Sequence, residues 1–252
     1  MIKQFLTRQK KILKGIYYSY FIKKGQEYEA GNFWNTSVYL HGISDRQTID
    51  PNQSPYSSKY HYCSVEMQIL KHLYNNCIET EKSSVLDIGS GSGHWIEFYK
   101  SLDAVKISGI DISETSINYL NQKYSTDPKI SFYKGKAVDI INQIQESFEI
   151  VNAIGIMFHI VDDKEWLETI NKISMKIPKN GIFVVGGHFG FLNGLNVQID
   201  QYGKINKRLR SKFVWKRALK KAGFSTIKIY KNNAYLWIKD TIPENNVLIA
   251  TK

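Results

Sequence analysis

Residues 85–95 read Val-Leu-Asp-Ile-Gly-Ser-Gly-Ser-Gly-His-Trp, and this stretch decides the fold class of the chain. An apolar strand leads into a glycine-rich turn, and the turn opens a helix. Glycine allows a tight turn and close approach to a ligand, and a helix N-terminus presents free N–H groups. In an open parallel sheet, this turn lies at the ligand crevice at the carboxyl ends of the strands. The glycines are spaced G-x-G-x-G, and His94 stands where the dinucleotide fingerprint G-x-G-x-x-G requires glycine.

Strands and helices alternate along the chain around this stretch. We expect strands over residues 84–88, 106–110, 130–133, 149–154, 181–186, 226–230 and 247–251. We expect helices over residues 63–75, 95–101, 114–122, 138–145, 164–176 and 212–222, with Asp163 capping the helix at 164 and Gly223 ending the last. This alternation predicts an α/β fold with a doubly wound, mostly parallel sheet. The last two strands follow each other without a helix, so they should form an antiparallel edge.

The charge of the chain is concentrated in two segments. Of 34 Lys and Arg residues, seven lie in residues 1–26 and twelve between Asp200 and Asp240, and neither segment contains an acid. The remainder has 15 basic residues against all 23 acidic ones, so an acidic body carries two basic segments, although the whole chain has a net charge of +11.

Several classes of protein are excluded by composition. No stretch approaches the roughly 18 consecutive apolar residues that span a bilayer. Two cysteines, Cys63 and Cys77, cannot build a disulfide framework, and no His and Cys residues have zinc-ligand spacing, so we expect no metal. A reducing cytoplasm is the simplest location.

The N-terminal region, residues 1–62, is expected to be a basic helix and lid that precede the main domain at residues 63–252. Residues 1–25 have apolar side chains at helical spacing with lysines on the opposite face, so this helix either packs on the body or contacts a membrane surface or a partner. Residues 31–61 are rich in Gly, Asn, Ser, Asp and Pro, which indicates a long loop or lid.

Asp111 strengthens the prediction of an adenosine ligand. It closes the strand at 106–110, about 20 residues after the glycine-rich turn, where an acid can hydrogen-bond ribose hydroxyls. With the Asp-x-Gly-x-Gly-x-Gly run of residues 87–93 and the segment 152–162, the chain from residue 63 resembles the small-molecule branch of the class I S-adenosylmethionine-dependent methyltransferases. The resemblance implies a seven-stranded, Rossmann-like sheet with a reversed last strand.

The resemblance also implies a set of cofactor contacts. The backbone of Gly89, Ser90 and Gly91 would follow the methionine part of S-adenosylmethionine, and Asp87 would lie near its amino group. Asp111 would bind the ribose and Ile112 would pack on the adenine; Ala137, Ala153 and Ile154 complete the set. The family often has Gly-Asp-Ala after the third strand, whereas this chain has Gly135-Lys136-Ala137. Lysine cannot accept a hydrogen bond, so Asp139, a backbone carbonyl or water must contact the adenine amino group.

Residues near the ends of the fourth and fifth strands are candidates for the acceptor site. Residues 152–155 lack the Asn/Asp-Pro-Pro-aromatic run of enzymes that methylate amino groups of nucleic-acid bases. His159 could be a general base or could only shape the pocket. His188 could face the acceptor. The lid positions of related enzymes correspond here to Tyr60, His61 and Tyr62, which otherwise pack in the core.

These observations predict S-adenosylmethionine-dependent methylation of a small, anionic acceptor, with oxygen favoured over nitrogen, such as a sugar or a phosphorylated or nucleotide-linked metabolite. Surface-polysaccharide synthesis is one such setting. The basic residues of 204–231 would attract the acceptor, or they form a solvated helix face. Two alternatives stay open: an RNA methyltransferase that binds phosphates through both basic segments, and a non-catalytic module that docks through its N-terminal helix.

Overall fold

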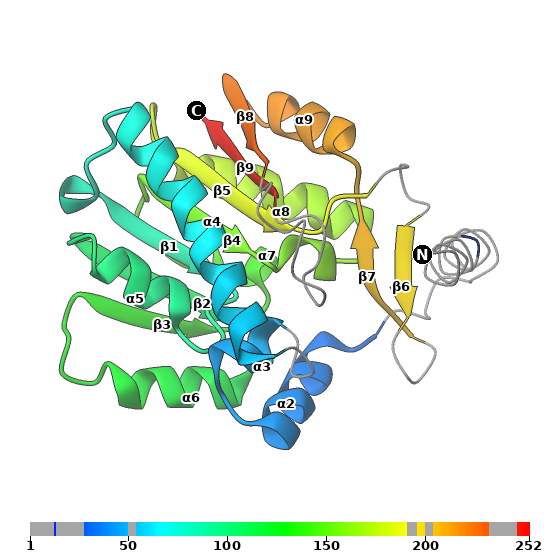
Figure 1. Ribbon diagram of the computed structural model, residues 1–252. Coiled ribbons are helices and arrows are strands. Elements are labelled where there is room, and N and C mark those ends of the chain that lie inside the picture. Colours follow the sequence, from blue (N-terminus) through cyan, green and yellow to red (C-terminus); the bar gives the residue numbers. More distant parts are fainter. Residues whose placement is uncertain (1–12, 14–27, 50–53, 191–195, 200–203, 232–245) are drawn as a thin grey trace.

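The computed structural model describes residue 13 and residues 28–49, 54–190, 196–199, 204–231 and 246–252. Its centre is a seven-stranded sheet in the order β3-β2-β1-β4-β5-β9-β8 (Figure 1). The strands are β1 (Ser84–Ile88), β2 (Lys106–Asp111), β3 (Ile130–Lys134), β4 (Ile150–Ile154), β5 (Ile182–Gly187), β8 (Thr226–Tyr230) and β9 (Asn246–Thr251). All seven predicted strands are confirmed, with bounds that agree to within one residue.

Strand directions also follow the prediction. The strands β1 to β5 are parallel to their neighbours, and β9 runs antiparallel to both β5 and β8. The reversed strand lies inside the sheet, between β5 and the edge strand β8. Because β1 and β4 are adjacent, the glycine-rich turn after β1 and the segment after β4 lie at the same edge of the sheet.

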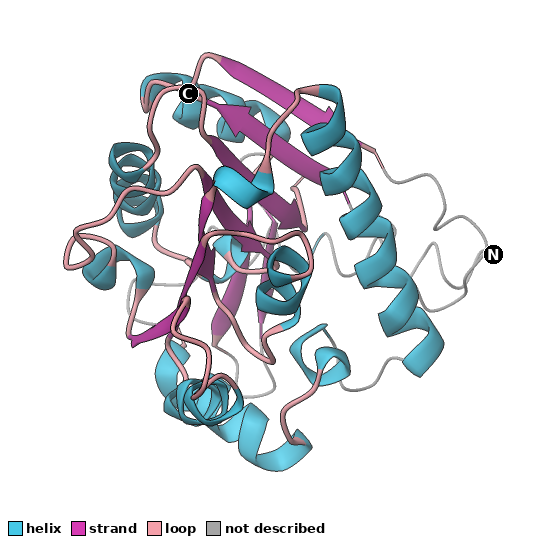
Figure 2. Ribbon diagram, turned by 90° about the vertical axis from the view of Figure 1, so that its left-hand side faces the viewer, coloured by secondary structure: helices cyan, strands magenta, loops and turns pink. Residues whose placement is uncertain are grey.

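Helices cover both faces of the sheet, as Figure 2 shows. One face carries α4 (Pro55–Asn75), α5 (His94–Lys100) and α6 (Glu114–Lys123); the other carries α7 (Ala137–Ile140), α8 (Asp163–Lys176) and α9 (Lys212–Lys221). Each face has its own cluster of buried apolar side chains. Two short 3-10 helices, η1 (Thr80–Lys82) and η2 (Met157–His159), complete these layers. The helix predicted over 138–145 ends at Ile140, so its second half is wrong.

The described residues of 31–61, which are 31–49 and 54–61, are largely helical, so the prediction of a long loop there is wrong. They contain most of α2 (Ala30–His41), α3 (Asp45–Ile49) and the first turns of α4. The residues that suggested a loop start and end these helices: Gly42 ends α2, and the Ser54 side chain caps α4 with Pro55 in its first turn. Helix α4 also crosses the predicted domain limit at residue 63.

The basic stretch at 204–231 is more structured than its composition suggests. The alternating pattern does not predict the hairpin of β6 (Asn196–Ile199) and β7 (Ile205–Leu209), which is separate from the main sheet. On α9, Trp215 faces the core with Ala218 and Leu219, whereas Phe213 is exposed. The lysines of α9 form a mainly solvated face.

Asp163 pairs with two arginines of this stretch and does not cap α8. The cap is Asp162, whose side chain accepts from the Glu165 N–H, so the predicted cap is wrong by one residue. Asp163 instead accepts from Arg208 at 2.6 Å and from Arg210 at 2.9 Å. Both guanidinium groups are therefore engaged within the fold, which weakens any phosphate track along this stretch.

The expected N-terminal helix of residues 1–25 lies outside the described residues, apart from residue 13. Among the helices of the described residues, none is long and apolar enough to cross a membrane.

Arg210 should stabilise the fold far more than Arg208. Its side chain is only 3% exposed, donates to the carbonyls of Ile160 and Asp162, and stacks 4.4 Å from the Trp166 ring. We expect Arg210→Ala to lower the free energy of unfolding by about 3 kcal/mol, because buried carbonyls lose their donors. The ion pair between Arg208 and Asp163 is more exposed, so it contributes less than about 1 kcal/mol to the free energy of unfolding. Urea denaturation of both variants measures this difference, and equal losses would contradict it.

Candidate functional site

The glycine-rich turn is held by backbone hydrogen bonds to the end of β2. The N–H groups of Gly89 and Ser90 both donate to the Ile110 carbonyl, at 2.7 and 3.2 Å. The N–H of Gly91 donates to the Asp111 carboxylate at 2.8 Å. Gly89 has a φ of +80°, which only glycine adopts readily. Because these N–H groups are used within the fold, the turn is a poor phosphate cradle.

Asp111 braces this turn and the start of α6. Its second carboxylate oxygen accepts from the Ser113 N–H at 2.7 Å, so both oxygens bind backbone. Burial raises the pKa of Asp111, and these N–H donors oppose that rise. Ile112 follows directly and is half-buried. The predicted ribose and adenine residues therefore lie together at the crevice, next to the turn.

Asp87 is a buried carboxylate that has only part of its hydrogen bonds. One oxygen accepts from Asn152 Nδ2 at 2.7 Å, and the other has no partner. Burial is the main cause that raises the pKa of Asp87 to about 6. A buried, unsatisfied carboxylate oxygen is unfavourable unless a cation or donor approaches it. Its position on β1, just before the turn, suits a cationic ligand in the crevice.

The N-terminal helices lie over the crevice. Asn35 on α2 accepts from the Ser113 hydroxyl at 2.9 Å, and Trp34 packs edge-on against His159 with ring centroids 5.0 Å apart. Helix α2 therefore reaches from the end of β2 to the segment after β4. A Cβ added at Gly91 would lie 2.8 Å from Thr48 Cγ2, so α3 lies directly on the turn.

His159 is positioned at the other end of the crevice. Its Nδ1–H donates to the Asn206 carbonyl on β7 at 2.9 Å, which leaves Nε2 as the acceptor nitrogen of the neutral ring. The Tyr28 hydroxyl donates to the backbone carbonyl of His159 at 3.3 Å. Burial, and then the nearby cation of Lys207, lower the pKa of His159 to about 3. The ring is therefore neutral, and only weakly basic, at neutral pH.

Other candidate residues gather around His159. The His188 ring lies 5.0 Å from Phe158, and Lys207 Nζ lies 5.6 Å over the same Phe158 ring. Burial, then Lys207 and His61, lower the pKa of His188 to about 4. The structure thus brings together three predicted residues, His61, His159 and His188. Lys207 belongs to the basic stretch at 204–231, and the unpredicted hairpin of β6 and β7 places it beside these histidines.

The remaining predicted residues lie on β4, on and just before α7, and on α4. Ala153 and Ile154 are buried in β4, and Ala137 starts α7. Asp139 is exposed on α7, and Lys136 lies 3.8 Å from Glu165. Tyr62 is buried and bonds Thr48, whereas the Tyr60 hydroxyl is buried without a partner.

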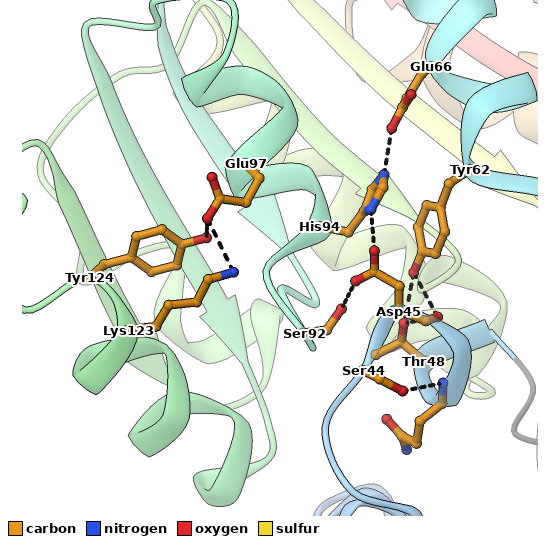
Figure 3. Close-up of polar contacts among 11 residues, drawn as sticks. Ser44, Asp45, Thr48, Tyr62, Glu66, Ser92, His94, Glu97, Lys123 and Tyr124 are labelled. Atoms are coloured by element: carbon orange, nitrogen blue, oxygen red, sulfur yellow. Dashed lines mark hydrogen bonds and ion pairs between the residues drawn. The ribbon is translucent and has the colours of Figure 1, made fainter. Parts of the chain in front are cut away.

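His94 and its neighbours form a polar cluster that sequence reasoning missed (Figure 3). His94 lies between the carboxylates of Asp45 and Glu66, each 2.7 Å from one ring nitrogen. The only available signal was the place of His94 directly after the glycine run. Within the described part of the chain, no group of His, Cys, Asp and Glu side chains could hold a metal ion.

Comparison with known proteins identifies the domain. Residues 85–181 match a family model described as a methyltransferase domain. The fold is similar to a magnesium protoporphyrin IX methyltransferase, ChlM, from Synechocystis PCC 6803 with bound SAH, at 14% identity and a TM-score of 0.62 over 88% of this chain and 97% of that chain. The chain carries a methyltransferase domain. No curated protein matches the chain significantly.

Two further structures share the fold of this methyltransferase domain. A DhpI-SAM-HEP complex has 14% identity and a TM-score of 0.62, with 94% of this chain and 98% of that chain covered. The N-methyltransferase NodS from Bradyrhizobium japonicum WM9 in complex with SAH has 13% identity and a TM-score of 0.57, with 86% and 96% covered. Identities this low establish a common fold and leave the acceptor open.

Asp87 should destabilise the ligand-free methyltransferase at neutral pH. Its folded pKa of about 6 exceeds the ordinary 3.8, so the charged form carries a penalty that is complete above pH 6 and disappears as the pH falls toward 4. We expect Asp87→Asn to raise the free energy of unfolding by about 2 kcal/mol at pH 7.5, and by much less at pH 4.5. Urea denaturation at both pH values, with the exposed-site variant Asp139→Asn as control, measures this. A gain that is equal at both pH values would contradict it.

Proposed function

We propose that this protein transfers the methyl group of S-adenosylmethionine to an oxygen of a small, anionic acceptor. The observation that carries the acceptor proposal is the convergence of His61, His159, His188 and Lys207 at one end of the crevice. A sugar, or a phosphorylated or nucleotide-linked metabolite, is the acceptor class we favour, as in surface-polysaccharide synthesis. We place this reaction in the cytoplasm, where such metabolites and the cofactor occur together.

The opposite end of the crevice suits the methionine part of the cofactor. Asp87 has a buried oxygen without a partner, and an ammonium group would supply both charge and hydrogen bond. The turn would offer backbone carbonyls, because the N–H groups of Gly89, Ser90 and Gly91 are already used. Asp111 and Ile112 would hold the ribose and adenine. When bound, the cofactor supplies an electrophilic methyl group on a sulfonium centre.

His159 is the residue we propose as general base. The Asn206 carbonyl holds its Nδ1–H, so the Nε2 lone pair is available to take the proton of an acceptor hydroxyl. The low pKa of the ring arises partly from the charge of Lys207. An anion bound beside Lys207 would offset that charge and raise the pKa of His159, which strengthens the base only when the acceptor is present.

Lys207 gives the acceptor end a positive potential. It lowers the pKa of both His159 and His188, so its field reaches both rings. Aromatic rings of Trp34 and Phe158 border the same place. Neutral imidazoles and aromatic rings suit the ring of a sugar, and the Lys207 cation suits a negatively charged group on the same acceptor.

Replacing His159 should affect turnover and leave cofactor affinity unchanged. We expect His159→Ala to lower kcat by about 100-fold or more, the contribution of a positioned general base. Calorimetric titration with SAH should give the same Kd for the variant and the wild type, because His159 lies away from the turn. Unchanged turnover would exclude His159 as the base.

The acceptor charge is tested with a panel of sugar phosphates, nucleotide sugars and matching neutral sugars, each incubated with methyl-labelled S-adenosylmethionine. We expect product from an anionic member, and about a tenfold rise in its KM for Lys207→Met, since one charge-assisted contact is lost. Lys216→Met, an exposed lysine on α9, should leave KM unchanged. Methylation of only neutral sugars, or of RNA with a steep salt dependence, would overturn the anionic small-molecule proposal.

A further inference from the structure

Three helices, α3, α4 and α5, meet at His94. The residue is the first of α5, directly after the glycine-rich turn. Its Nδ1 lies 2.7 Å from Asp45 Oδ2 on α3, and its Nε2 lies 2.7 Å from Glu66 Oε1 on α4 (Figure 3). Only the imidazolium form can donate to both carboxylates at once. The three side chains therefore form a charge-assisted bridge from α4 through α5 to α3.

Other contacts converge on the same short helix. The Ser92 hydroxyl, in the glycine-rich turn, donates to Asp45 Oδ1 at 2.7 Å. The Tyr62 ring stacks on His94 with centroids 3.6 Å apart, and its hydroxyl pairs with Thr48 Oγ1 at 2.7 Å. Burial alone would raise the pKa of Asp45, but the hydrogen bonds from His94 and Ser92 lower it. Asp45 is thus held as a carboxylate.

Helix α3 depends on these contacts for its position. It has five residues, too few for a helix that is stable by itself. Thr48 lies against Gly91, so α3 closes the crevice over the part of the turn that would contact the methionine end of the cofactor.

We propose that Asp45, His94 and Glu66 form a latch that holds α3 over the glycine-rich turn, and that opening of this latch controls dissociation of the demethylated cofactor. His94 is a positioning residue in this proposal, because it acts on the ligand through α3. The proposal rests on the proposed function for the identity of the ligand, and the position of α3 can be tested without any ligand.

The latch is placed where it can open. The side chains of Asp45 and Glu66 are 48% and 26% exposed, so water can solvate both carboxylates when their bonds to His94 break. A cleft of about 440 Å³, lined in part by Lys59, Glu97 and Lys123, borders all three residues. A fully buried bridge would instead hold α3 permanently.

The first experiment is hydrogen exchange of the ligand-free protein. We expect the backbone amides of residues 45–49 to exchange roughly tenfold faster in Asp45→Asn and His94→Gln than in the wild type, since a charge-assisted bond is lost. Glu97→Gln is the matched control, because Glu97 lies on α5 beside the same cleft and bonds Tyr124, away from α3. Unchanged exchange in both latch variants would overturn the latch, whatever ligand the protein binds.

The second experiment measures SAH dissociation by stopped-flow competition. We expect the dissociation rate to rise roughly tenfold in Asp45→Asn and His94→Gln, with the association rate little changed and Glu97→Gln like the wild type. Faster exchange of α3 with an unchanged SAH dissociation rate would show that α3 does not gate release, and would overturn that part of the proposal. If the wild type binds no SAH, the proposed function fails while the exchange experiment still decides the latch.

Discussion

The hydrogen bond from the Gly91 N–H to the Asp111 carboxylate is the contact on which the crevice depends. It joins the turn after β1 to the end of β2, and the Ile110 carbonyl strengthens the same junction by accepting from Gly89 and Ser90. With its N–H groups used in this way, the turn is rigid and does not act as a phosphate cradle. The inner end of the crevice would then suit the cationic, adenosine-bearing cofactor that we propose for it.

Charge is separated along the crevice. Asp87 provides an unsatisfied carboxylate oxygen below the turn, whereas Lys207 provides positive potential beside the neutral rings of His159 and His188. A site with this polarity can align a cationic methyl donor with an anionic acceptor, and alignment supplies much of the rate of an in-line displacement. The penalty of burying Asp87 in the ligand-free protein would be relieved by an ammonium group, so stability and binding oppose each other at this residue.

The parts of the site that could be predicted belong to short stretches of sequence. The Asp-x-Gly-x-Gly-x-Gly run and Asp111 lie at strand ends, where apolar periodicity locates the strand and the next residues must face the crevice. His94 was missed because its partners are 28 and 49 residues away, and no local pattern reports such pairs. The composition of residues 31–61 predicts a loop because Gly, Ser and Pro are common in loops. In this fold, Gly42, Ser54 and Pro55 instead start and end helices.

By itself, the sequence determined one local motif: a strand, a glycine-rich turn and a helix, followed by a strand that ends in an acid. That motif was enough to predict the methyltransferase fold. Hydrophobic periodicity and glycine spacing are local properties, so they can be interpreted without knowing which distant residues are in contact. Only the tertiary structure decided which charges meet: it paired both Arg208 and Arg210 with Asp163, and brought Lys207 close enough to lower the pKa of His159. Electrostatic function depends on distances between residues remote in the chain, and folding alone sets those distances.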